Sequence, residues 1–187
     1  MKDLTKGRPS VLILTFALPI FLANLLQLTY SLADTRIVGT FLGDNALAAV
    51  GATTTLSNLI VQFLMGMCNG FAIISAQCFG AKDMDRLRRS LGNSLVLGLL
   101  AAVVLTIGGL VFLQSILRFL NVPENLLNTA TQYVSVIIAG LVVTLLYDVL
   151  AATLRAIGDT VTPLIVLAVS VVLNIGGDLL LIVVLHM

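Results

Sequence analysis

Two predominantly apolar stretches of this chain contain a carboxylate. Asp34 lies within residues 28–43 (LTYSLADTRIVGTFLG), and Asp178 lies within residues 169–185 (VSVVLNIGGDLLLIVVL). A carboxylate inside a bilayer costs several kcal/mol unless it faces a protein interior, water or an ion. Asn174 precedes Asp178 by four residues, so the two side chains share one face of a helix. These three residues are therefore the first candidates for a functional site.

Two chemistries suit this set of side chains. Counting 1.5 Å per helical residue, we expect Asp34 and Asp178 to lie at a similar depth, roughly 10 Å below the outer surface of the membrane. If their helices pack together, two carboxylates and an amide supply the oxygen ligands that a small cation such as Na+ requires. Two adjacent carboxylates can equally share a proton. The sequence leaves both alternatives open.

Other polar residues extend or compete with this cluster. Tyr30 lies one turn before Asp34, so it is expected either to line a cavity with that carboxylate or to hydrogen-bond a backbone group. Gln27 extends the polar stripe toward the cytoplasm and is expected to line the cavity. Asp34 has an alternative interpretation as an interfacial residue paired with Arg36. Tyr133 lies at the start of a later span, and from this position it is interpreted as an anchor at the membrane interface. Asp148 lies close to Arg155 and is a weaker candidate near the cytoplasmic end.

The composition places the chain in the membrane. It is 59% hydrophobic and 10% charged, with a mean hydropathy of +1.11, whereas soluble domains carry roughly 25% charged residues. The net charge of +1 gives no indication of nucleic-acid binding. We find no phosphate loop, no HExxH motif and no nucleophile with its base, so neither an enzyme nor a cofactor is expected. Cys68 and Cys78 are expected to be small packing residues.

Hydropathy predicts an all-α integral membrane protein with five spans. Each needs about 20 apolar residues to cross the bilayer core. The predicted spans are residues 11–40, 46–79, 91–117, 126–154 and 163–185. If they alternate, eight Lys and Arg residues fall on one side and two on the other. The positive-inside rule then places the N-terminus in the cytoplasm and the C-terminus outside.

Three segments carry a resemblance to a known family. Residues 18–51 resemble the first-helix region of the multidrug and toxic compound extrusion (MATE) family. Residues 70–91 resemble that family's second helix end and following loop, and residues 154–182 its fourth loop and fifth helix. The resemblance covers nearly the whole chain.

This resemblance implies an antiporter that exports cationic or amphipathic drugs in exchange for Na+ or H+ across the plasma membrane. The family's ion-binding residues fall on Asp34, Asn174 and Asp178, and its cavity-lining aromatic positions fall on Tyr30 and Tyr133. Family members have about twelve helices in two lobes. Residues 1–187 are therefore expected to be a partial N-terminal lobe, with a sixth helix and a C-terminal lobe as its partners.

Two alternatives remain beside the exporter. Lobes of lipid-linked sugar flippases share the wider architecture, but they carry basic residues in the cavity, whereas acids predominate here. A membrane fragment that packs without transporting is the other alternative.

Overall fold

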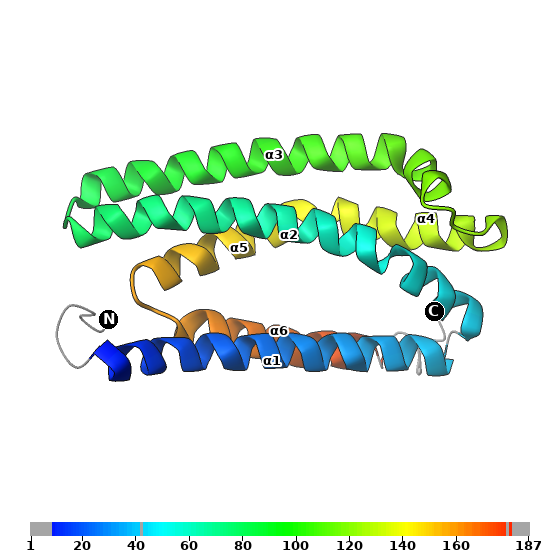
Figure 1. Ribbon diagram of the computed structural model, residues 1–187, viewed down its shortest axis with the longest axis horizontal. Helices are drawn as coiled ribbons and strands as arrows, with labels where there is room; N and C mark the ends of the chain where they lie inside the picture. Colours follow the sequence, from blue (N-terminus) through cyan, green and yellow to red (C-terminus); the bar gives the residue numbers. More distant parts are fainter. Residues whose placement is uncertain (1–8, 42, 179, 181–187) are drawn as a thin grey trace. The chain divides into compact units, whose positions relative to one another are not determined.

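The computed structural model describes residues 9–41, 43–178 and 180, and the described part consists of helices joined by short turns. The helices, labelled in Figure 1, are α1 (Pro9–Phe41), α2 (Asp44–Gly80), α3 (Met84–Phe119), α4 (Glu124–Ala139), α5 (Leu141–Ala156) and α6 (Val161–Asp178). They form two compact units. Unit 1 contains α1 and α6, and unit 2 contains α2 to α5.

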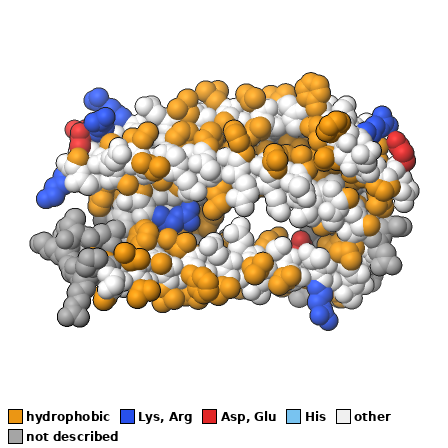
Figure 2. Space-filling model, in the orientation of Figure 1, with side chains coloured by type: hydrophobic (Ala, Val, Ile, Leu, Met, Phe, Trp, Pro, Cys, Tyr) orange, Lys and Arg blue, Asp and Glu red, His pale blue; other side chains and the backbone are white. Residues whose placement is uncertain are grey.

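The described helices confirm the all-α membrane class. Three of them are long and apolar enough to cross a bilayer, namely Ser10–Phe41, Leu47–Gly80 and Met84–Phe119. The described apolar part of α6, Val161–Gly177, is shorter, and the end of the predicted fifth span at residues 181–185 lies outside the described residues. Figure 2 shows apolar side chains spread over the whole visible face and only a few charged ones, which suits a lipid environment.

The fourth predicted span, residues 126–154, contains two helices. It consists of α4 and α5, which are bent by 43° at Gly140. The Gly140 N–H donates to the carbonyls of Val136 at 3.0 Å and Ile137 at 3.1 Å, and the next helix begins at Leu141. A hydropathy profile records only the apolar run and is insensitive to such a bend.

The bent pair continues along α3 rather than turning back on it. A side chain added at Gly109 of α3 would meet Ile138 of α4 at 3.1 Å, and one added at Gly98 would meet Leu145 of α5 at the same distance. The position on α3 that the chain contacts therefore moves from Gly109 before the bend to Gly98 after it. A re-entrant loop would reverse that progression, so these contacts favour one broken span made of α4 and α5.

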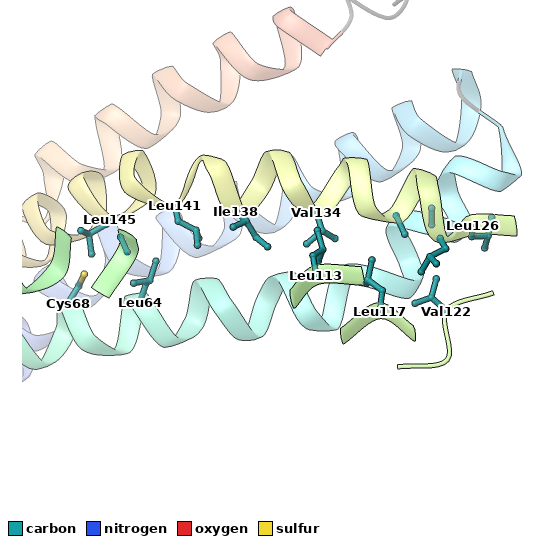
Figure 3. Packing of buried hydrophobic residues seen from close by; sticks show 14 of the residues in the cluster. Leu64, Cys68, Leu113, Leu117, Val122, Leu126, Val134, Ile138, Leu141 and Leu145 are labelled. Carbon is teal, nitrogen blue, oxygen red and sulfur yellow. The ribbon is translucent and has the colours of Figure 1, made fainter. Parts of the chain in front are cut away.

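The core of unit 2 is a continuous set of buried aliphatic side chains. Figure 3 shows Leu64 and Cys68 of α2 beside Leu141 and Leu145 of α5, with further leucines of α3 and α4 along the same row. The approach of α4 and α5 to α3 uses the small residues Gly98 and Gly109, as close packing of membrane helices does. Cys68 and Cys78 are both buried free thiols, as expected.

Unit 1 is built from α1 packed against α6, and the two helices run in the same direction (Figure 1). The α6 helix begins where Asp159 accepts hydrogen bonds from the backbone N–H groups of Val161 at 3.2 Å and Thr162 at 3.0 Å. Pro163 follows in the first turn, where a missing N–H costs little. The helices that carry Asp34 and Asn174 are thus brought side by side, although 140 positions separate the two residues in the sequence.

Candidate functional site

Asp34 lies on the less exposed face of α1. Partly buried residues recur along this helix at intervals of three and four, and the stripe includes Tyr30, Asp34 and the buried Val38. Such spacing marks the face that a membrane helix turns toward protein. Asp34 is therefore half-buried within the protein-facing stripe rather than directed wholly at lipid. Gln27 lies off this stripe and is exposed.

The α6 part of the predicted cluster is described less fully. Partly buried residues of α6 also recur at helical spacing, and Asn174 lies at the border of that stripe with its side chain exposed. The side chain of Asp178 lies outside the described residues, although its backbone ends α6. The structure brings the two helices together, and the joint cluster of Asp34, Asn174 and Asp178 stays a prediction.

Tyr133 belongs to the other unit. It lies on α4, is half-buried and packs against the aliphatic core of unit 2. This contact anchors the ring within the helix bundle. Its predicted role in lining a cavity with Tyr30 stays a prediction, because the two residues lie in separate units.

Metal-site geometry is limited in the described part of the chain. Among the described residues, no group of three or more His, Cys, Asp and Glu side chains lies close enough to hold a metal ion. The predicted cation cluster has two acids and an amide, and one of those acids lies outside this set.

A polar face of α2 was missed by the sequence reasoning. Thr55, Asn58, Gln62 and Asn69 are exposed and lie three, four or seven residues apart on one side of the helix. Gly66 and Gly70 lie on the same side, and a side chain added at either would meet nothing within 4 Å. Amides are unfavourable against lipid, so this face requires a protein partner or water. The regular spacing was the available signal in a span that carries no charge.

Asp148 lies in α5, and its predicted place near the cytoplasmic end of the span stays a prediction. On α5 it lies on the same side as the buried Leu141, Leu145 and Ala152, and it is half-buried. Arg155 follows two turns later on this face. The carboxylate thus points toward the interior of unit 2 rather than along the lipid-facing surface.

Comparison with known proteins gives the context for these sites. The profile of the MatE family matches residues 19–180. The "Probable multidrug resistance protein YoeA" of Bacillus subtilis (strain 168) is 35% identical over 173 residues, covering 91% of this chain and 37% of that protein. The "FAD transporter" of Shewanella oneidensis is 26% identical over 91% of this chain and 37% of that protein.

Solved structures agree with this assignment. The crystal structure of MATE in the straight conformation superposes with a TM-score of 0.88 and 27% sequence identity, covering 97% of this chain and 40% of that one. The chain thus spans about two-fifths of the length of the relatives it matches. Family profile, relatives and fold all agree, and the chain belongs to the MatE family, the multidrug and toxic compound extrusion transporters.

Proposed function

We propose that this chain forms the N-terminal lobe of an antiporter in the plasma membrane. It exports cationic or amphipathic compounds in exchange for Na+ or H+, and its N-terminus lies in the cytoplasm. The membrane helices and the relatives named as multidrug resistance proteins support the transport class. The coupling ion, the orientation and the substrate class are the finer parts of the proposal.

The observation that carries this function is the position of Asp34. A half-buried carboxylate lies in the partly buried stripe of α1, and α1 packs against α6, the helix of Asn174. An acid in a membrane helix is costly unless it faces protein, water or an ion, so a carboxylate on this face is the candidate for binding a proton or a cation during the working cycle. Exchange of that ion against a cationic substrate is the step by which an antiporter couples the two movements.

The polar face of α2 supports the presence of a wet pathway. Asn58, Gln62 and Asn69 offer uncharged donors and acceptors, which suit substrates of varied structure. The described membrane helices place acids rather than clusters of Lys or Arg in their interior. This charge balance favours a cationic substrate over the anionic carrier of a lipid-linked sugar flippase.

The chain acts with further helices in this proposal. It spans 37% of its relative from Bacillus subtilis. A sixth membrane-spanning helix, separate from α6, and a second lobe are therefore the partners that complete the transport path. The relative named as a FAD transporter indicates that substrates differ among related proteins.

Dye efflux from cells tests the proposal, with this chain expressed alone and as part of a full-length transporter. Asp34→Asn keeps the shape and hydrogen bonding of the side chain but removes its charge, and we expect export by the full-length protein to be lost at equal expression. Asp85→Asn is the matched control, because Asp85 is exposed in the first turn of α3.

Collapsing the Na+ and proton gradients separately identifies the coupling ion. Normal efflux by the Asp34→Asn protein would remove Asp34 from the mechanism. Absence of efflux from the full-length protein under every gradient would favour the non-transporting alternative.

A further inference from the structure

The turn between α2 and α3 carries the densest group of basic side chains in the described part of the chain. Four exposed cations lie within residues 82–89, and we call them the basic turn: Lys82, Arg86, Arg88 and Arg89. Figure 2 shows Lys and Arg side chains gathered at this end of unit 2. Four cations against two acids, Asp83 and Asp85, leave the segment with a net charge of +2.

The acids of this segment do not pair with its cations. Asp83 caps α3, because one of its carboxylate oxygens accepts a hydrogen bond of 2.9 Å from the backbone N–H of Arg86. Among the described residues, no carboxylate oxygen lies within 4.0 Å of a cation of the basic turn. At the opposite end of α3, by contrast, Arg118 lies 3.7 Å from the carboxylate of Glu124. The charges of the basic turn therefore have no counter-ion within unit 2.

Backbone hydrogen bonds fix the turn that carries these cations. The Lys82 N–H donates to the carbonyl of Phe79 at 3.0 Å. The Asp83 N–H donates to the carbonyl of Cys78 at 3.1 Å. Leu87 is half-buried and directs the first turns of α3 toward unit 2. The cations thus extend from a short, hydrogen-bonded connection, so little backbone ordering is needed when they bind a partner.

The distance from the apolar run of α3 places the basic turn at the headgroup layer. The membrane-span candidates of α2 and α3 end at Gly80 and begin at Met84. Arg86 precedes the start of the predicted third span, Leu91, by five residues, or about 7.5 Å of helix. The polar layer on each side of a bilayer core is roughly 5–8 Å thick. The basic side chains are therefore at the level where lipid phosphates lie.

From this arrangement we infer that the basic turn binds the phosphate groups of anionic phospholipids such as phosphatidylglycerol. An arginine can donate to two phosphate oxygens at once, and three of the four cations are arginines. Successive helical positions are about 100° apart, so Arg86 and Arg88 lie on either side of Leu87 and Arg89 lies roughly opposite it. Guanidinium groups that point outward in different directions suit a surrounding layer of headgroups better than a single compact ligand.

This inference requires only that α2 and α3 span a membrane, and it does not depend on the proposed antiport. The basic residues near a span also act on its orientation. The lipid contact is a separate property, because it is measured in protein that has already been inserted and purified.

Fluorescence quenching by brominated lipids tests the inference in a full-length transporter reconstituted in bilayers. Residues 1–187 contain no tryptophan, so Met84→Trp reports the lipids beside the basic turn once any tryptophan elsewhere in the transporter is replaced by phenylalanine. We expect brominated phosphatidylglycerol to bind there several times more strongly than brominated phosphatidylcholine, and high salt to reduce this preference. Arg89→Gln should lower the preference by up to about fivefold, which corresponds to the ~1 kcal/mol that a basic residue contributes near an anionic surface.

Two controls show whether the preference is local and whether it depends on charge. Phe119→Trp places the reporter at the opposite end of α3, where Arg118 is paired, and should show little preference between the two lipids. Arg89→Lys keeps the charge, and with it the orientation signal, and should retain most of the preference.

Equal quenching by the two lipids in the Met84→Trp protein would overturn the inference. Equal preferences at the two reporter positions would show that the basic turn is not the source. Equal losses in Arg89→Gln and Arg89→Lys would contradict binding through charge. Release of the lipid by inorganic phosphate, beyond the effect of chloride at the same ionic strength, would assign the site to a soluble phosphate instead.

Discussion

The hydroxyl of Thr106 in α3 donates a hydrogen bond of 3.2 Å to the backbone carbonyl of Ile138 in α4. Ile138 lies two residues before Gly140, where the fourth span bends. The last carbonyls of a helix lack partners within that helix, and in a bilayer no water replaces them. A side chain of one helix thus stabilises the bend in another.

We expect Thr106→Val to destabilise unit 2 by about 0.6 kcal/mol and by no more than about 1.7 kcal/mol, which are the average and the largest values measured for hydrogen bonds between membrane helices. Thr106→Ser retains the hydroxyl and should lose much less. The free energy of unfolding, measured by SDS titration in mixed micelles, compares the two. Equal losses for valine and serine would show that packing of the methyl group, rather than the hydrogen bond, supports the bend.

Adjacent glycines of α3 should respond differently to enlargement. A Cβ atom at Gly109 would lie 3.1 Å from Cδ1 of Ile138, whereas one at Gly108 would meet nothing within 4 Å. Gly109→Leu should therefore cost about 1–3 kcal/mol through overpacking, and Gly108→Leu should cost little. In the Gly109→Leu protein, Ile138→Ala should cost less than it does alone, because the two residues contact each other. Additive losses in the unfolding titration would contradict this contact.

The start of α6 should depend on the charge of Asp159. The side chain and backbone of Thr162 donate to its carboxylate at 2.6 and 3.0 Å, and these hydrogen bonds lower the pKa of Asp159 below its ordinary value. A lowered pKa adds stability that is present at neutral pH and is lost as the pH falls below about 4. Hydrogen exchange of the Thr162 amide should accelerate relative to the intrinsic rate in acid. Asp159→Ala should remove this pH dependence, whereas an unchanged dependence would exclude Asp159 as its source.

The broken fourth span predicts which side of the membrane each loop occupies. If α4 and α5 cross together, reporter fusions at Asp85 and Asp159 should both be cytoplasmic and a fusion at Glu124 external. The basic residues Arg86, Arg88 and Arg89 near the start of α3 support this orientation. A reading at Asp159 on the same side as Glu124 would show that the pair re-enters instead. A cytoplasmic reading at Glu124 would reverse the whole orientation.

The two acids of the predicted ion cluster should act as one titrating unit. In a full-length transporter we expect Asp178→Asn to lower efflux strongly, and the double Asp34→Asn, Asp178→Asn protein to be no worse than Asp34→Asn alone. Efflux rates at matched expression, with Asp83→Asn at the exposed α2–α3 turn as control, make the comparison. If the fold-reduction of the efflux rate in the double variant equals the product of the reductions in the two single variants, the two acids belong to independent sites.

Much of the architecture follows from the sequence because the bilayer permits few structures. Apolar runs around Leu25, Leu64 and Leu100 can satisfy their backbone groups in lipid only as helices, so the first three spans and the all-α class were predictable. The cost of an acid in lipid likewise marked Asp34 as a candidate. The family resemblance of residues 18–51 to MATE transporters was confirmed by a match that extends over residues 19–180.

The tertiary structure decided what hydropathy cannot record. Thr106 of another helix donates a hydrogen bond beside the bend at Gly140, and a one-dimensional apolar profile does not contain such contacts. The inward direction of Asp148 depends on which side of α5 packs against α3, which Gly98 and Leu145 determine by their close approach. The sequence by itself shows which residues are costly in a bilayer, whereas the packing of one helix on another determines which of them face protein.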